Sequence, residues 1–233
     1  MFAYRHSFCL LLTKFFDELQ TSSIAPNTRI CVTTTPLCDI AAYLMCNVAQ
    51  IRDGNAILDT FAGSCATLLA ASMIAPRCRT VGIEIAHSGY VNRDDIGKDF
   101  DKRGLPQPVG LLRGDSSDPS IRDKARAAIG NRAFDAIITD PPYGIREASS
   151  CNSSSPLEQL FAAIARDYEA GTPLLKKGGR LSVFVPVTAE QTLVENLPHR
   201  SLETEAGLRF ESSMEQFLNE KLSRYLVCYV CTR

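Results

Sequence analysis

The sequence predicts an α/β fold with a doubly wound, mostly parallel, seven-stranded sheet whose last strand is antiparallel. Strand-like and helix-like patterns alternate from about Pro36 to the end of the chain, as in folds built from βαβ units. The last two strand-like runs have no long helix between them, which indicates an antiparallel pair at the sheet edge. Apolar residues make up 45% of the 233 residues and charged residues 22%, so the chain can bury a core.

Each expected element follows from local patterns, since short apolar runs predict buried strands and longer amphipathic runs predict helices. Ser64 is a candidate N-cap for the helix after the first strand. Pro141 and Pro142 end the fourth strand, because proline has no backbone N–H and a fixed φ. We expect helices at 36–50, 64–75, 88–102, 120–129, most of 156–175 and 188–195, and strands at 55–59, 79–84, 109–113, 134–139, 179–185, 202–212 and 224–231.

The N-terminal residues 1–32 are expected to form a short helical extension. Leu12, Phe15, Phe16 and Leu19 fit one face of an amphipathic helix. The apolar run before them is too short to span a bilayer and lacks a cleavage pattern, so we expect no membrane association.

Charge and cysteine content narrow the function classes. The net charge of −1 and pI of about 6.3 lack the strongly basic footprint of a self-sufficient nucleic-acid binder. The nine cysteines are irregularly spaced, and strand alternation puts Cys228 and Cys231 on opposite faces, so we expect no metal site. An odd number of cysteines without a signal peptide predicts reduced thiols and a cytoplasmic protein.

Four acidic residues fall at successive strand ends: Asp59, Glu84, Asp115 and Asp140. In a doubly wound sheet these ends line one crevice. Gly63 would let the backbone approach a ligand, Glu84 suits the two hydroxyls of a ribose, and Asp115 could accept from an adenine amine. Any one of them alone is more often a solvated residue, but four in phase with the strands indicate a site.

The fourth strand runs directly into Asp140-Pro141-Pro142-Tyr143. An acid, two prolines and an aromatic residue at a strand end suit methylation of an exocyclic amine on a flat base. The Asp140 carboxylate and the carbonyl beside it would accept the amine hydrogens and stabilise the positive charge that develops on nitrogen. The Tyr143 ring offers a stacking face. A strand end closed by a turn is the plain alternative.

The segment 137–147, IITDPPYGIRE, resembles the eukaryotic and archaeal tRNA guanosine N2-methyltransferases that act on position 10 of tRNA. These are Rossmann-like class I methyltransferases that use S-adenosylmethionine. Residues 35–50 resemble the family's motif X helix, and residues 215–224 resemble its closing hairpin. The resemblance therefore implies a methyltransferase catalytic domain over residues 33–233.

The resemblance also implies site residues and a reaction, namely methyl transfer from S-adenosyl-L-methionine to N2 of a tRNA guanosine. The implied catalytic residues are Asp140, Pro141, Pro142 and Tyr143. The implied cofactor-binding residues are Thr35, Asp59, Phe61, Ala62, Gly63, Ser64, Glu84, Ile85, Asp115, Ser116 and Asp140. The implied substrate-binding residues are Tyr143, Gly144, Arg146 and Arg224, of which Arg146 would contact phosphate or pair with Glu147.

The chain departs from the family in two respects. The family usually has a second glycine in its first motif where this chain has Cys65, whose side chain would crowd the methionine part of the cofactor. The family also carries an N-terminal THUMP RNA-binding domain, for which the residues before motif X are too few. We therefore expect a catalytic fragment, or a protein that borrows RNA binding from a partner. Eukaryotic members work with a small zinc-binding activator, so such an activator or an RNA-binding subunit is implied.

Two alternatives to a tRNA guanosine enzyme remain open at this point. Asp140 to Tyr143 would serve equally in a DNA or RNA adenine-N6 methyltransferase, although the extended string at 137–147 favours RNA. A non-catalytic methyltransferase-fold subunit that stabilises a partner is the second alternative. Cys65 and the missing RNA-binding domain favour it, whereas the intact residues Asp140 to Tyr143 argue against it.

Overall fold

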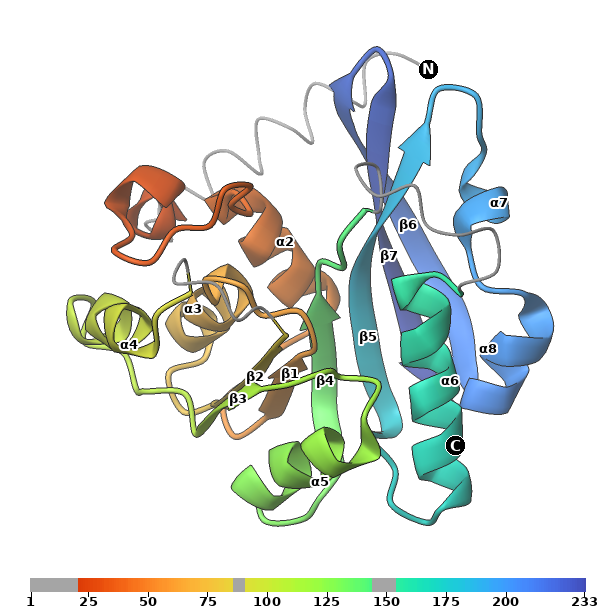
Figure 1. The fold of residues 1–233 in the computed structure, drawn as a ribbon, viewed down its shortest axis with the longest axis horizontal. Helices are drawn as coiled ribbons and strands as arrows, with labels where there is room; N and C mark the ends of the chain where they lie inside the picture. Colours follow the sequence, from red (N-terminus) through yellow and green to blue (C-terminus); the bar gives the residue numbers. More distant parts are fainter. Residues whose placement is uncertain (1–20, 86–90, 144–153) are drawn as a thin grey trace.

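The computed structural model describes residues 21–85, 91–143 and 154–233. A seven-stranded sheet in the order β3-β2-β1-β4-β5-β7-β6 runs through the molecule (Figure 1). The first five strands are parallel, and β7 lies antiparallel between β5 and β6. The predicted sheet is confirmed. Its strands are β1 (Ala56–Asp59), β2 (Arg79–Glu84), β3 (Gly110–Arg113), β4 (Phe134–Thr139), β5 (Leu175–Thr188), β6 (Leu208–Asn219) and β7 (Leu222–Cys231).

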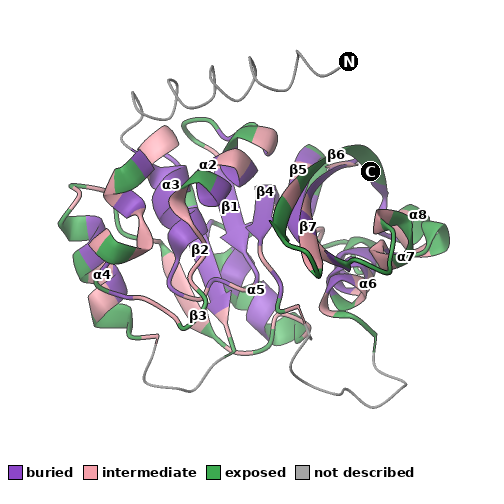
Figure 2. Cartoon of the chain, turned by 90° about the horizontal axis from the view of Figure 1, so that it is seen from above, coloured by how far each residue is buried: buried purple, intermediate pink, exposed green. Residues whose placement is uncertain are grey.

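Helices cover both faces of the sheet (Figure 2). Alternate strand residues belong to two separate cores. Ile57 and Ile138 face the first core, whereas Leu58 and Ile137 face the second. This alternation follows from the two-residue period of a strand. The first core is covered by α2 (Asp39–Val48), α3 (Ala66–Ile74) and α4 (Arg93–Asp101), and the second by α5 (Pro119–Ala128), α6 (Pro156–Glu169) and α8 (Arg200–Ala206), with α7 (Leu193–Asn196) beside them.

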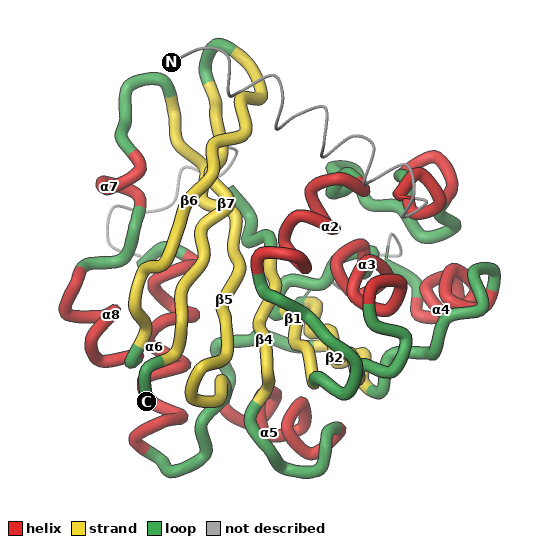
Figure 3. Tube along the Cα trace, turned by 180° about the vertical axis from the view of Figure 1, so that it is seen from behind, coloured by secondary structure: helices red, strands yellow, loops and turns green. Residues whose placement is uncertain are grey.

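The expected strand at 202–212 is wrong in its first half. Residues Arg200–Ala206 form α8, and the strand β6 begins only at Leu208. The helix ends because Gly207 takes φ +65, the left-handed conformation that glycine adopts at helix C-termini. The β6–β7 hairpin itself is confirmed and extends well beyond the parallel strands (Figure 3).

Several other boundaries differ from expectation. The helix expected at 188–195 is limited to α7, because β5 continues to Thr188. The helix after β1 begins at Ala66 with Cys65 as its N-cap, so Ser64 does not cap it. The helix α6 ends at Glu169, and β5 begins earlier than expected, at Leu175. An irregularity in the β4–β5 pairing accommodates this early start, and a Cβ at Gly179 would come within 2.8 Å of a backbone oxygen.

Residues 21–31 pack against the first core. They form two short 3-10 helices, η1 (Thr21–Ile24) and η2 (Pro26–Thr28), and Ile24 is fully buried. The predicted amphipathic helix with Leu12, Phe15, Phe16 and Leu19, and the start of the helix expected at 88–102, lie outside the described residues. None of the helices described has the length and apolar character needed to cross a bilayer.

A buried ion-pair network joins α5 to α6. Arg122 is fully buried and donates to both carboxylate oxygens of Asp167 at 2.7 Å. Arg126 donates to the same carboxylate at 3.0 Å. Arg126 also pairs with the exposed Asp123, so among the acids that the structure describes it is Arg122 that depends on Asp167 alone.

We expect Asp167→Ala to lower the free energy of unfolding by about 3–5 kcal/mol, because it strands a buried cation. Chemical denaturation measures this loss. Arg77→Ala is the matched control, because its pair with Asp53 is mostly exposed and should contribute at most about 1 kcal/mol. Equal losses in the two variants would contradict a structural role for the buried network.

Candidate active site

The carboxyl edge of the sheet gathers the four predicted acids. Asp59, Glu84 and Asp140 lie at or just after the ends of β1, β2 and β4, and Asp115 follows β3. These strands are neighbours in the sheet, and the strand order reverses between β1 and β4. Such reversal points are where ligands bind in open α/β sheets. The fold therefore places the four acids at one edge of the sheet, and of the four only Glu84 lines the pocket there.

Asp59 organises this edge from within. Its carboxylate is 1% exposed and accepts hydrogen bonds from the Phe61 N–H and from the hydroxyls of Thr67 and Thr139. These donors lie on the following loop, on α3 and at the end of β4. Because protein donors occupy its oxygens, Asp59 fixes the loop after β1 to α3 and to the end of β4.

The loop after β1 forms one wall of an open pocket. Gly63, at φ +48, donates its N–H to Glu84 Oε2 at 2.8 Å. A Cβ at Gly82 would lie 2.9 Å from Ala62 Cβ, so the loop packs directly on β2. The predicted pair of Gly63 and Glu84 is thus brought together, with Ala62 beside them.

The pocket suits an adenosyl group. It is an open hollow in which the Glu84 carboxylate and the Gly63 backbone lie near apolar side chains and near Arg93 and Arg113. A carboxylate binds ribose hydroxyls, and apolar walls hold a flat base. Sequence reasoning missed these apolar walls, because they come from α4 and β3 rather than from a motif. They include Val91, Ile96, Leu111 and Leu112.

The other predicted cofactor residues lie around this pocket. Thr35 is exposed in the segment before α2, and Ile85 is 55% exposed after β2. Asp115 is exposed and accepts from the Ser117 N–H at 2.8 Å. The carbonyl of Ser116 accepts from Arg122 at 2.9 Å, which ties this loop to the buried network. None of these four lines the pocket itself.

Cys65 occupies the position where the resembled family usually has glycine. Its backbone takes φ +62, a left-handed conformation that favours glycine. The residue is 1% exposed and belongs to the first core. Burial raises the pKa of its thiol, so the side chain remains a neutral, apolar group.

A second cluster lies at the end of β4. The Tyr143 hydroxyl donates to Asp140 Oδ1 at 2.9 Å, and Arg224 on β7 donates to that hydroxyl at 2.9 Å. Arg224 also lies 3.4 Å from Asp140 Oδ2. Three residues predicted separately for catalysis and substrate binding therefore form one hydrogen-bonded group.

Two residues that sequence reasoning did not place in the site fix Arg224. Gln216 on β6 accepts from Arg224 Nε at 2.7 Å, and the Phe184 ring on β5 lies 3.9 Å from the guanidinium carbon. Cross-strand pairing of Gln216 with Arg224 would have pointed to the first contact, but only with the hairpin register in hand. Arg224 is thereby held against Asp140.

Burial raises the pKa of Asp140, and Arg224 and the Tyr143 hydroxyl act in the opposite direction. Burial also raises the pKa of Tyr143, so its hydroxyl stays protonated and can donate. Pro141 is buried, whereas Pro142 is exposed. Gly144 and Arg146 lie outside the described residues.

Residues 26–207 match a protein family described as RMKL-like, methyltransferase domain. The chain belongs to this family. Its fold is also that of solved methyltransferases. TrmN from Thermus thermophilus aligns over 91% of this chain and 52% of its own, with 18% identity and a TM-score of 0.55. Precorrin-6y C5,15-methyltransferase from Geobacter metallireducens GS-15 aligns over 89% and 97%, with 14% identity and a TM-score of 0.56.

Curated relatives carry the name tRNA (guanine(10)-N(2))-methyltransferase TRMT11. The protein from Gallus gallus is 27% identical over 217 residues, which cover 80% of this chain and 44% of the relative. The protein from Dictyostelium discoideum is 33% identical over 116 residues, which cover 48% and 21%. These matches confirm the family resemblance stated from the sequence. The chain spans less than half the length of these relatives.

We expect Arg224→Met to raise the pKa of Asp140 further, because it removes the cation that opposes burial. A carboxyl-carbon NMR titration, with the signal assigned through Asp140→Asn, measures the shift. Arg180→Met is the matched control, since Arg180 pairs with Glu211 and not with Asp140. An Asp140 titration that is the same in Arg224→Met and wild type would rule out this electrostatic role.

Proposed function

We propose that this domain transfers a methyl group from S-adenosyl-L-methionine to the exocyclic N2 of a guanosine in tRNA. The observation that carries the proposal is the cluster of Asp140, Tyr143 and Arg224 at the carboxyl edge of the sheet, beside the pocket with Glu84. The names of the curated relatives support the choice of substrate.

Asp140, Tyr143 and Arg224 would each make a different contribution to binding and activating the substrate amine. The Asp140 carboxylate has about four acceptor positions, and Tyr143 and Arg224 use only part of them. The remaining capacity accepts the amine hydrogens and stabilises the positive charge on nitrogen as it attacks. Arg224 favours the ionised form of Asp140, and the Tyr143 ring provides a face for the base.

The loop from Asp59 to Ser64, with Glu84, would hold the cofactor. When bound, the cofactor supplies a methyl group on a sulfonium. Glu84 would accept hydrogen bonds from the ribose hydroxyls. It also accepts a hydrogen bond from the Gly63 N–H, which keeps the loop after β1 in place. Aligning the amine with the methyl group supplies much of the acceleration in such an in-line displacement. Thr35, Ile85, Asp115 and Ser116 complete the proposed cofactor site.

An adenine-N6 methyltransferase remains the second candidate, because an adenine amine would make the same contacts with Asp140. The residues of the cluster do not select between the two amines, so the relatives alone favour guanosine. A non-catalytic subunit is a weaker candidate, since the cluster and the pocket are both assembled.

RNA binding is expected to need help from outside the domain. The net charge of −1 gives little general attraction for phosphate, which supplies much of the affinity for nucleic acid. An RNA-binding domain or subunit, or a small zinc-binding activator, would supply it. We propose that the protein acts in the cytoplasm.

The test is to incubate the chain with unmodified tRNA and labelled cofactor, with and without a candidate partner, and to digest the product to nucleosides. We expect label in N2-methylguanosine and higher yield with the partner. Label in N6-methyladenosine would refute the guanosine assignment. Strong activity of the chain alone would refute the need for a partner.

We expect Asp140→Ala to abolish methyl transfer while cofactor affinity stays within a few-fold of wild type. The carboxylate acts on the amine and does not line the cofactor pocket. Single-turnover transfer and calorimetry measure the two effects. Transfer at near wild-type rate would contradict the mechanism, and a parallel loss of cofactor binding would move Asp140 to the cofactor site.

A further inference from the structure

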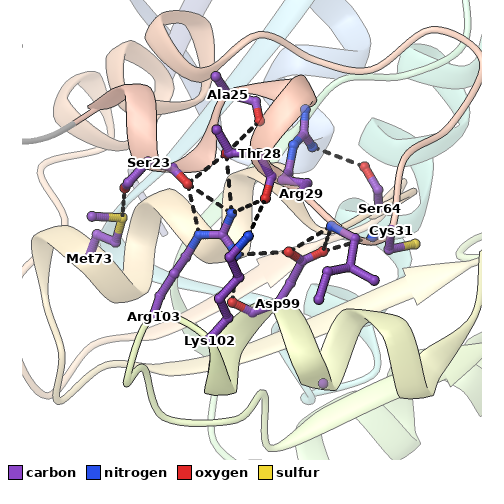
Figure 4. Close-up of polar contacts among 12 residues, drawn as sticks. Ser23, Ala25, Thr28, Arg29, Cys31, Ser64, Met73, Asp99, Lys102 and Arg103 are labelled. Carbon is purple, nitrogen blue, oxygen red and sulfur yellow. Dashed lines mark hydrogen bonds and ion pairs between the residues drawn. The ribbon is translucent and has the colours of Figure 1, made fainter.

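Arg29, in the segment before α2, is a buried cation. It is 6% exposed, yet its guanidinium binds only neutral groups among the described residues. Nη1 donates to Ser64 Oγ at 3.0 Å and Nη2 to the Leu37 carbonyl at 2.7 Å (Figure 4 shows the first contact). Nε is buried and has no hydrogen-bond partner in the described part of the chain. Buried charges are normally paired.

Burial lowers the pKa of Arg29 and the nearby Asp99 carboxylate opposes this effect, although no ion pair between the two residues is present. Asp99 on α4 is fully buried and forms its ion pair with Arg103, at 2.7 Å. Its oxygens also accept from the backbone N–H groups of Ile30 and Cys31 (Figure 4). Asp99 therefore holds the backbone at Ile30 and Cys31 and forms its ion pair with Arg103. No ion pair joins Arg29 to any acid that the structure describes.

Arg29 joins two segments that contain proposed cofactor-binding residues, namely the loop after β1 and the segment before α2. Ser64 belongs to the loop after β1, and Leu37 follows Thr35 in the segment before α2. Thr33 lies against the same loop, since its methyl group would be 3.8 Å from a Cβ at Gly63. The burial of Arg29 excludes a surface contact with an RNA phosphate.

We propose that Arg29 provides the positive charge that recognises the α-carboxylate of adenosylmethionine. The inference rests on the proposed function, because it takes that cofactor as the ligand. A guanidinium pairs with a carboxylate through strong, directional hydrogen bonds. Asp99 and Arg103 position Arg29 by holding residues 23–31 on α4.

The test compares adenosylmethionine with decarboxylated adenosylmethionine, which differs from it only in the carboxylate. Calorimetry should show that the wild type binds the intact cofactor at least ~10-fold more tightly, which corresponds to about 1.4 kcal/mol. Arg29→Gln keeps a hydrogen-bonding side chain but removes the charge, and should bind the two ligands within about 2-fold. Arg29→Lys should restore part of the preference.

Phe161→Leu is the matched control for a merely structural effect. Phe161 is fully buried in the second core and packs edge-on against Tyr229, so the variant should lower the melting temperature but keep the wild-type preference. A preference that survives in Arg29→Gln, or is absent in the wild type, overturns the assignment of Arg29 alone. Wild-type protein that binds neither ligand overturns the proposed cofactor, and the role of Arg29 with it.

Discussion

The buried carboxylate of Asp59 is the interaction on which both halves of the site depend. It ties the end of β1 to α3 through Thr67 and to the end of β4 through Thr139. Burial raises its pKa to about 6, against the lowering effect of Thr67, the Phe61 N–H and Thr139. A carboxyl group whose pKa is higher in the folded than in the unfolded protein makes the folded state less stable as pH rises. For Asp59 this loss of stability occurs between pH 3.8, the ordinary pKa of an aspartate, and about pH 6. At neutral pH the buried, ionised carboxylate therefore destabilises the fold, while its hydrogen bonds fix the loop after β1 and the end of β4.

The two halves of the site are built in different ways. The pocket around Gly63 and Glu84 comes from neighbouring parallel strands, so its geometry follows from the pairing of β1 with β2. The cluster proposed to bind the substrate amine instead joins Asp140 to Arg224, 84 residues later in the chain. It exists only because β7 lies antiparallel to β5 and places Arg224 opposite Pro186. The position of Arg224 beside Asp140 thus depends on the β6–β7 hairpin, which is far along the chain from Asp140 to Tyr143.

How far apart in the chain the contacting residues lie explains which parts of the site the sequence could predict. Strand ends, the four acids and Asp140 to Tyr143 are marked by local signals: apolar runs, glycine and two prolines. Gln216, Phe184 and Arg29 carry no local signal, because their roles come from contacts across the sheet or with a distant loop. The helix α8 was missed for a related reason. Its seven residues bury only Ala206, so it lacks the apolar face by which a helix is recognised in a sequence.

Cys65 shows how a departure from a family pattern can be compatible with the site. Left-handed backbone costs a non-glycine residue about 1–2 kcal/mol, so its φ of +62 needs compensation. The Cys65 N–H donates to the Ala62 carbonyl at 2.7 Å, and the thiol is buried in the first core. The same conformation that glycine would provide is therefore retained, while the added side chain fills core space. The residue is 1% exposed but lines the pocket with Ala62 and Gly63, so its side chain forms part of the pocket wall. The backbone path of the loop is nevertheless the one that glycine would take, and the buried guanidinium of Arg29 beside this loop would suit an anionic group.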